Sequence, residues 1–242
     1  MDFVYYKNNK VDVYIPNKPN FTTIIYFHGG GLVEGSRSQE NLVEICNRFK
    51  ELNFCVFNFD YSLYPNAKFP DYIIDAAEAV KCAIKKSTEL GGNGKFFVSG
   101  SSAGAYISAM LLSNKKYLKD IGVDSSKING WFLESGQMTD HFHVIEFEEH
   151  LDPKIEKITR FSPIFFINDE FKCSPIKLLV YENDIPNRVK QNIKFKDLIA
   201  KNNANKISLT ILKGCHCEGS SKKDIDGEYP FIKEFLNFIQ DC

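Results

Sequence analysis

The sequence predicts one α/β domain whose central sheet is mostly parallel and carries helices on both faces. Short apolar runs alternate with helical patterns along the whole chain, which is typical of this class. A glycine-flanked serine turn joins one predicted strand directly to a helix. The length of 242 residues suits one sizeable domain of this kind, and no internal repeat or low-complexity linker interrupts it. Residues 1–242 are therefore predicted to form a single domain.

The predicted buried strands are short, apolar and rich in branched or aromatic side chains, as expected for strands covered on both faces. A further run, Val11–Ile15, is predicted to be an antiparallel strand at the sheet edge. The buried strands are Thr23–Phe27, Cys55–Phe59, Phe96–Ser99, Gly130–Leu133, Leu178–Tyr181 and Ser208–Leu212.

Apolar residues spaced three and four apart predict helices between these strands. Ser38 is a candidate N-cap of the first helix, and the glycine-rich run 91–94 is expected to end the second. The apolar stripes are Leu42, Ile45, Cys46 and Phe49; Ile73, Ala77, Val80 and Ile84; Ile107, Met110 and Leu111; Phe195, Leu198 and Ile199; and Ile232, Phe235, Leu236 and Ile239.

The composition is ordinary for a globular chain, with 43% hydrophobic and 25% charged residues and a net charge of -1. No long run of one charge sign is present, so neither nucleic acid nor a membrane is expected as a partner. The chain shows no secretory leader and no apolar run near the roughly 20 residues that span a bilayer. The 7 scattered cysteines favour reduced thiols. A cytoplasmic location is predicted, with a secreted mature form as the alternative, and the oligomeric state stays open.

The turn Gly100-Ser101-Ser102-Ala103-Gly104 matches the pattern G-x-S-x-G between a strand and a helix. Such a turn holds its serine in a strained backbone conformation, which small residues two before and two after the serine relieve. Ser102 has glycine at both positions, whereas Ser101 does not. Ser102 is therefore the predicted nucleophile.

Three glycines follow a buried strand directly in the run His28-Gly29-Gly30-Gly31. Glycines there let the backbone approach a ligand closely. A phosphate-binding loop is disfavoured, because no G-x-G-x-x-G or Lys-Ser/Thr signature follows. We expect the backbone N–H groups of Gly29, Gly30 and Ala103 to form an oxyanion hole, and His28 to anchor the loop by hydrogen bonds.

His216 is the predicted general base. In chains with this nucleophile turn, the order along the sequence is serine, acid, histidine. Of the 5 histidines, only His216 lies beyond the last predicted strand and before the final helix. The neighbours Cys215 and Cys217 raise the alternative of a metal site, but their spacing around His216 is poor for one tetrahedral ion.

Asp184 is the predicted acid, because it lies in the turn after the strand Leu178–Tyr181. Its carboxylate would hold the imidazole of His216 in the correct tautomer. Glu182 is the rival in the same turn, and Asp140 is a more distant one.

One other group of potential ligands comprises His141, His143, Glu146, Glu149 and His150. A zinc site is conceivable from these residue types. A polar, solvated face is the favoured interpretation, and no metal site is predicted.

The connection from Glu134 to Pro175 is far longer than the usual four to six residues or so. Its aromatic residues argue against disorder. We predict that residues 134–175 form a short cap-like insertion over the site.

Taken together, the motifs resemble the hormone-sensitive-lipase-like branch of α/β-hydrolase esterases. The resemblance extends from about Val11 to the end of the chain. It implies the α/β-hydrolase fold and the hydrolysis of a small-molecule carboxylic ester, without metal or organic cofactor. The residues that carry it are His28-Gly29-Gly30-Gly31, Asp60-Tyr61-Ser62-Leu63-Tyr64-Pro65, Gly100-Ser101-Ser102-Ala103-Gly104, Asp184 and His216.

The chain also departs from that branch. It has Ser62, Tyr64 and Asn66 where the branch usually has Arg, Ala and Glu, and Ser101 where an acidic residue often precedes the nucleophile. The segment before His28 is too short for the N-terminal cap helices common in the branch.

The predicted function is cleavage of short-chain carboxylic esters through a Ser-His-Asp triad and an acyl-enzyme intermediate. The alternatives with the same residues are an amidase or arylformamidase, resembling kynurenine formamidases, and a peptidase resembling dipeptidyl peptidases. An alternative of another class is a non-catalytic relative that only binds a ligand.

Overall fold

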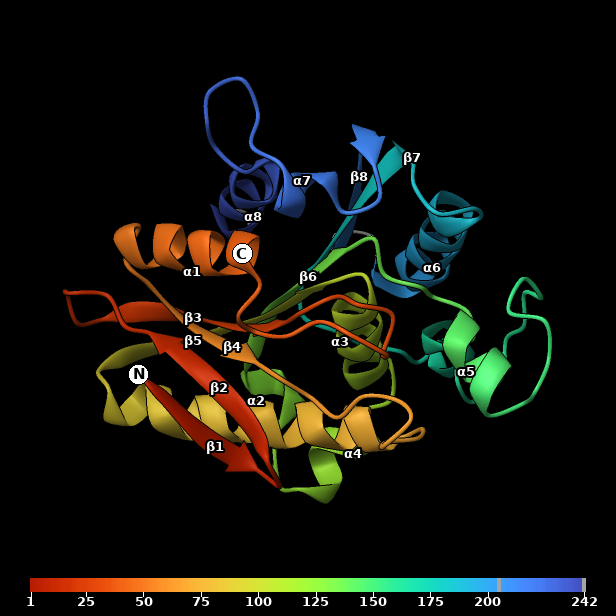
Figure 1. The fold of residues 1–242 in the computed structure, drawn as a ribbon, viewed down its shortest axis with the longest axis horizontal. Coiled ribbons are helices and arrows are strands. Elements are labelled where there is room, and N and C mark those ends of the chain that lie inside the picture. The colour runs from red at the N-terminus through yellow and green to blue at the C-terminus, as the bar shows by residue number, and fades with distance from the viewer. Residues whose placement is uncertain (204–205, 241–242) are drawn as a thin grey trace.

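The computed structural model describes residues 1–203 and 206–240, and its centre is a sheet of eight strands in the order β1-β2-β4-β3-β5-β6-β7-β8. β2 runs antiparallel to both of its neighbours, and all other neighbouring pairs are parallel. Helices lie on both sides of this twisted sheet (Figure 1). The predicted mostly parallel sheet with helices on both faces is confirmed.

Each of the six predicted buried strands lies within an observed strand. β8 is nevertheless the edge strand, and its side chains are largely half-exposed or exposed, so the prediction of a buried strand at Ser208–Leu212 is wrong in that respect. The strands are β1 (Asp2–Tyr6), β2 (Asn9–Tyr14), β3 (Phe21–Phe27), β4 (Phe54–Phe59), β5 (Gly92–Ser101), β6 (Ile128–Glu134), β7 (Ile176–Asn183) and β8 (Ile207–Cys215).

The prediction of an edge strand at Val11–Ile15 is also wrong in one respect. The strand is antiparallel as expected, but β1 pairs with its outer side and makes it internal. β1 was missed because its side chains alternate between exposed and half-buried and make no apolar run. Tyr5 contributes an edge-to-face contact with Phe59, with ring centroids 4.8 Å apart, which holds β1 against the core.

The helices divide into two layers. α2, α3 and α6 pack on one face of the sheet, and α1 and α8 pack on the other. The helices are α1 (Glu40–Glu51), α2 (Asp71–Glu89), α3 (Ala103–Ser113), α4 (Lys116–Asp120), α5 (Phe142–Phe147), α6 (Arg188–Asn203), α7 (Glu218–Ser221) and α8 (Pro230–Gln240), with 3₁₀ helices η1 (Ser125–Lys127) and η2 (Pro163–Phe166).

Ser38 does not cap α1. The helix begins after Gln39, which makes no side-chain capping bond. Ser38 lies one residue too early, and its hydroxyl pairs instead with that of Ser36 at 2.9 Å. The expectation that the glycine-rich run 91–94 ends the second helix is confirmed. α2 ends before Gly91, whose φ of 90° favours glycine.

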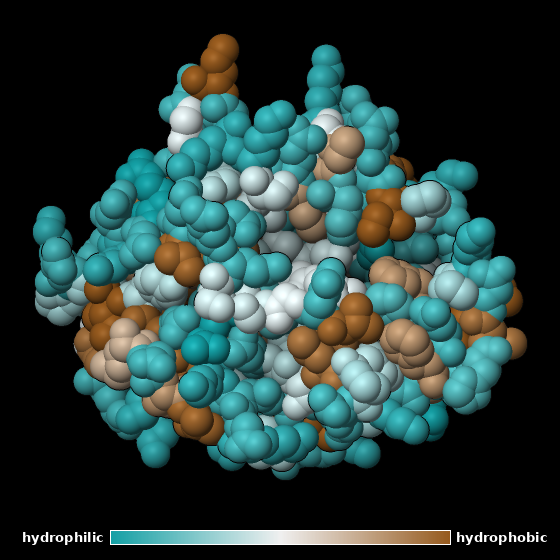
Figure 2. All heavy atoms as spheres, in the orientation of Figure 1, coloured by the Kyte–Doolittle hydropathy of each residue, from teal (hydrophilic) through white to brown (hydrophobic). Residues whose placement is uncertain are grey.

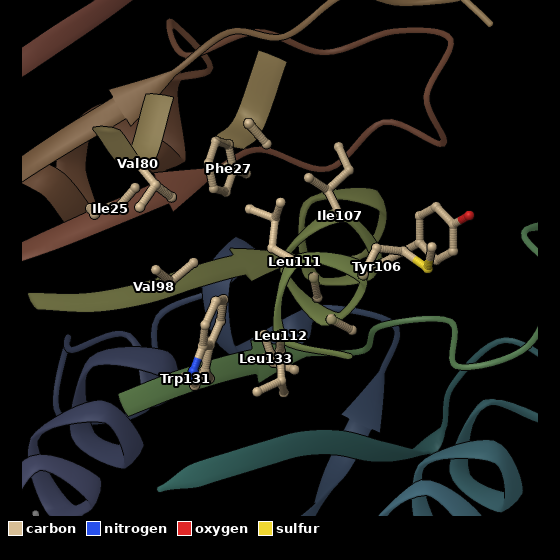
Figure 3. Packing of buried hydrophobic residues seen from close by; sticks show 14 of the residues in the cluster. Ile25, Phe27, Val80, Val98, Tyr106, Ile107, Leu111, Leu112, Trp131 and Leu133 are labelled. Atoms are coloured by element: carbon tan, nitrogen blue, oxygen red, sulfur yellow. The ribbon is translucent and has the colours of Figure 1, made fainter. Parts of the chain in front are cut away.

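α3 is buried along its whole length and packs beneath the centre of the sheet. Ile107 and Leu111 belong to the same cluster as Ile25 and Phe27 of β3 and Val98 of β5 (Figure 3). A helix that is apolar on all sides is stable only when it is enclosed in this way. The enclosure fixes the position of the residue that precedes α3, which is Ser102.

The long connection between β6 and β7 runs from residue 135 to residue 175, because Glu134 belongs to β6. We call it the β6–β7 segment. It contains α5 and η2. The carboxylate of Asp140 organises it by accepting hydrogen bonds from the backbone N–H and hydroxyl of Thr159, at 2.9 and 2.8 Å, and from the hydroxyl of Ser162.

The surface in Figure 2 is mostly hydrophilic, with apolar residues in small separate groups. No helix within residues 1–203 and 206–240 is long and apolar enough to cross a bilayer. The six cysteines in those ranges form no disulfide, and Cys242 lies outside them.

The enclosure of α3 predicts a large effect of Ile107→Ala on stability. Ile107 is 0% exposed, and removing buried methyl and methylene groups leaves a cavity, so the free energy of unfolding should fall by about 2–5 kcal/mol. Ile225→Ala is the matched control, because Ile225 is fully exposed. Urea unfolding measures both variants. Equal losses in the two would contradict the described packing of α3.

Candidate active site

Ser102 lies at the sharp turn between β5 and α3, with φ 53° and ψ -114°. A positive φ is strained for a residue with a side chain. The flanking glycines make the turn possible, since a Cβ on Gly104 would lie 2.0 Å from the carbonyl oxygen of Phe27, and one on Gly100 would lie 2.6 Å from the carbonyl carbon of Gly104. The backbone N–H of Ser102 donates to the carbonyl of Glu134 at 2.8 Å.

His216 lies between Ser102 and Asp184. Its Nε2 is 2.8 Å from the hydroxyl oxygen of Ser102, and its Nδ1 is 2.5 Å from Oδ1 of Asp184. With Asp184 ionised, Nδ1 carries the proton and donates it to the carboxylate, which leaves Nε2 free to accept from the hydroxyl. The structure thus brings these three predicted residues into one hydrogen-bonded chain.

Asp184 follows β7, and its side chain is fully buried. Its carboxylate accepts hydrogen bonds from the hydroxyl of Ser135 at 2.6 Å and the backbone N–H of Ile185 at 2.7 Å, besides that of His216. Burial alone would raise the pKa of Asp184, but the bonds from His216 and Ser135 outweigh it and hold the pKa below its ordinary value. Asp184 is therefore ionised at neutral pH.

The two rival acids lie elsewhere. Glu182 is exposed at the end of β7. Asp140 is buried in the β6–β7 segment, where Thr159 and Ser162 occupy its carboxylate. Neither of them is hydrogen-bonded to His216.

Of the predicted oxyanion residues, Gly29 and Ala103 lie beside Ser102. A Cβ on Gly29 would lie 3.4 Å from that of Ser102, so the loop backbone passes close to the serine. Gly30 has φ 113°, and its carbonyl accepts hydrogen bonds from the backbone N–H groups of Val33 and Glu34 at 3.1 and 3.0 Å. Ala103 is buried directly after Ser102.

His28 holds this loop from inside the core. It is 1% exposed, and its ring stacks on that of Tyr61 with centroids 4.4 Å apart. Its Nδ1 lies 2.6 Å from the carbonyl oxygen of Gly29, and its own carbonyl accepts the hydroxyl of Tyr61 at 2.9 Å.

The sequence reasoning missed Glu134, which lies beneath the site. The carboxylate is fully buried and accepts hydrogen bonds from the hydroxyls of Ser101 and Tyr181, both at 2.5 Å, and from the backbone N–H of Ser220 at 3.1 Å. Burial raises its pKa, and the three hydrogen bonds partly offset the rise.

Ser135, the partner of Asp184, was also missed. It has φ 53° and lies at the carboxyl end of β6. Polar residues at the carboxyl end of a buried strand of a parallel sheet, or directly after it, are a signal that would have indicated both Glu134 and Ser135.

The expectation of a solvated histidine face at residues 141–150 is wrong for His141. Its side chain is 2% exposed and packs on Phe142 and Tyr106, with ring centroids 4.5 and 5.0 Å apart. His143 contacts the carbonyl oxygen of Gly31 through Nδ1. In the part of the chain that the structure describes, no group of three or more His, Cys, Asp or Glu side chains is arranged to hold a metal ion.

Solved structures with this arrangement of strands and helices include esterase 2 of Thermogutta terrifontis, phosphoramylated by tabun. It matches 99% of this chain and 94% of that chain with a TM-score of 0.79 and 22% sequence identity. The same esterase with butyrate bound matches with a TM-score of 0.75 and 22% identity, over 99% of this chain and 94% of that one. The predicted α/β-hydrolase fold is confirmed.

Similar curated proteins include neutral cholesterol ester hydrolase 1 of Pongo abelii, which is 31% identical over 100 residues, or 40% of this chain and 24% of that protein. Kynurenine formamidase of Danio rerio is 28% identical over 194 residues, or 77% of this chain and 63% of that protein. The matched part of the chain thus spans less than two thirds of the length of either relative.

The family model named BD-FAE matches residues 11–148, which are more than half of the chain and include both the glycine loop and the nucleophile turn. This chain therefore belongs to the BD-FAE family.

Proposed function

We propose that this chain hydrolyses carboxylic esters, with Ser102 as nucleophile, His216 as general base and Asp184 as its acidic partner. The observation that carries the proposal is the continuous chain of hydrogen bonds from Asp184 through His216 to the hydroxyl of a serine held in a strained turn. Nucleophile, base and orienting carboxylate in this geometry are the components of acyl transfer.

In the first half of the reaction, the Ser102 oxygen attacks the ester carbonyl carbon while His216 Nε2 takes the hydroxyl proton. The carbonyl electron pair moves to oxygen, where the backbone N–H groups of Gly29, Gly30 and Ala103 stabilise the negative charge. The carbon–oxygen bond to the leaving alcohol then breaks, and the alcohol takes the proton from His216. The product is an acyl-enzyme on Ser102.

In the second half, His216 removes a proton from water as the water oxygen attacks the acyl carbon. The bond to Ser102 breaks, and the serine oxygen regains a proton from His216. Asp184 stays ionised throughout and stabilises the imidazolium form of His216 in both halves. Ser135 acts on this step only through Asp184, whose carboxylate it holds at 2.6 Å.

We further propose that the β6–β7 segment is a cap that limits the acyl group to a short chain. Phe142 from this segment lies near the glycine loop, since a Cβ on Gly31 would be 3.7 Å from its ring. The similar esterase of Thermogutta terrifontis has been solved with propionate and with butyrate bound, which supports a site for short acyl groups.

Amide or formamide cleavage is the second candidate function. The match to kynurenine formamidase extends over 77% of this chain, more than the match to neutral cholesterol ester hydrolase 1. The same three residues serve either reaction, because both pass through an acyl-enzyme. Rates on matched phenyl ester, anilide and N-formyl aniline substrates separate the two functions.

The proposed nucleophile predicts that Ser102→Ala loses at least about three orders of magnitude in kcat on 4-nitrophenyl butyrate. The fold should survive, because His216 is the only hydrogen-bond partner of this hydroxyl among the residues that the structure describes. Ser126→Ala is the matched control, since Ser126 is exposed on η1. Retention of activity in the Ser102 variant, with the same circular dichroism as the wild type, would refute the role of Ser102.

The proposed acid predicts that Asp184→Asn lowers kcat by roughly four orders of magnitude, because the imidazole then loses its correct tautomer. Glu182→Gln makes the same chemical change two residues earlier, at an exposed position, and should stay within about twofold of the wild type. An active Asp184 variant beside an inactive Glu182 variant would reverse the assignment.

The proposed cap predicts a limit on acyl length. Each buried methylene contributes about 0.8 kcal/mol, so kcat/KM should rise by up to about fourfold per carbon from acetyl to butyryl or hexanoyl and then stop rising. A series of 4-nitrophenyl esters from two to sixteen carbons measures this. A maximum at twelve carbons or more would show that the segment forms no such limit.

A further inference from the structure

Arg188 is the first residue of α6, and its side chain is almost completely buried. It is only 3% exposed. Within the described residues its guanidinium makes no hydrogen bond and no ion pair, although none of its nitrogens is completely sealed from solvent. A buried cation without a hydrogen-bonded partner costs considerable free energy. The surroundings of the guanidinium therefore indicate what could offset this cost.

Arg188 lines a pocket of about 490 Å³ between the β6–β7 segment and the start of α6. These two parts of the chain lie near one another beside the carboxyl end of the sheet (Figure 1). Phe142, Ile155 and Ile185 give the pocket apolar walls. Phe142 also approaches the glycine loop at Gly31, and Ile185 follows Asp184 directly, so two residues of the pocket wall lie next to parts of the proposed catalytic site.

The other charges near Arg188 do not neutralise it. Asp184 lies more than 4 Å from the guanidinium, and three other donors occupy its carboxylate. Glu156 lines the pocket but is exposed and accepts a hydrogen bond from Gln191 at 3.1 Å. Lys154, also exposed, adds a second positive charge at the pocket.

The guanidinium remains charged under ordinary conditions. Burial lowers the pKa of Arg188 to about 10, and the negative charge of Asp184 limits the decrease. Thr139 lines the same pocket, and its buried hydroxyl has no hydrogen-bond partner. Arg188 and Thr139 thus line one pocket with apolar walls, and the polar groups of both lack a hydrogen-bond partner among the described residues.

We propose that Arg188 binds a carboxylate on the substrate, so that the preferred esters carry this anionic group on either their acyl or their alcohol part. The planar guanidinium suits a carboxylate, which it can bind through two parallel hydrogen bonds. The apolar walls hold the hydrocarbon or aromatic spacer between that carboxylate and the ester. That the bound carboxylate belongs to a substrate rests on the proposed ester hydrolysis at Ser102. The binding of the anion itself can be measured without turnover.

The first measurement is therefore binding alone. Benzoate and the isosteric neutral benzamide are titrated by calorimetry into the wild-type chain, Arg188→Met and Lys190→Met. Methionine removes the charge and keeps an unbranched side chain that reaches to the position of the arginine Nε. Lys190 is the matched control, because it is exposed on the same helix outside the pocket. We expect the wild type and Lys190→Met to bind benzoate at least about tenfold more tightly than benzamide, and Arg188→Met to lose this preference.

The second measurement locates the carboxylate within the substrate. Monoethyl succinate against ethyl pentanoate places the charge on the acyl part, and 4-acetoxybenzoate against its methyl ester places it on the alcohol part. In one of the two pairs, kcat/KM of the wild type should favour the anionic ester at least about tenfold. That ratio should fall about tenfold in Arg188→Met and stay unchanged in Lys190→Met.

The outcomes distinguish this inference from the proposed function. Equal binding of benzoate and benzamide by the wild type, or an undiminished preference in a folded Arg188→Met variant, overturns the anion site. If Arg188→Met does not fold, the comparison of the two ligands is made in Lys154→Met, because Lys154 is the other positive charge at the pocket. A preference for benzoate that persists there supports Arg188, and one that is lost overturns the assignment. If none of the four esters is cleaved while benzoate binding still depends on Arg188, the anion site stands and ester hydrolysis fails.

Discussion

The buried carboxylate of Glu134 joins the parts of the chain that must meet for this site to exist. Its side chain accepts hydrogen bonds from Ser101, beside the nucleophile, from Tyr181 of β7, and from the backbone of Ser220, which follows the loop that carries His216. Its own backbone carbonyl accepts the N–H of Ser102. One residue at the end of β6 therefore fixes the serine and the histidine loop against the same point.

The rest of the site follows from the carboxyl ends of adjacent parallel strands. The glycine loop follows β3, and Ser102 follows β5. Glu134 and Ser135 lie at the end of β6, Asp184 follows β7, and the loop with His216 follows β8. Since such ends lie along one edge of the sheet, each short loop needs to place only one or two groups. The β6–β7 segment and the start of α6 then enclose the pocket that contains Arg188.

Much of this arrangement was predictable from the sequence because it depends on local patterns. Short stretches of sequence predict the turn around Ser102 and the glycine loop. They also predict the positions of Asp184 and His216 after their strands. Contacts between residues that are far apart in the sequence could not be predicted from such patterns. The burial of His141, the pairing that makes Val11–Ile15 internal, the carboxylate of Glu134 and the unpaired charge of Arg188 all depend on neighbours far away in the sequence. For His141, Glu134 and Arg188, residue type alone suggests an exposed side chain, and only tertiary packing overrides this expectation.

The proposed ester hydrolysis depends most on a covalent step at Ser102. The direct measurement is reaction of the native chain with a fluorophosphonate, followed by mass spectrometry of the intact chain and of its peptides. We expect a single adduct, on Ser102, in the native chain and no adduct in a chain that was unfolded before the reaction. Only the folded chain places His216 Nε2 2.8 Å from the Ser102 hydroxyl. An adduct on another serine, or a folded chain that does not react, would contradict it.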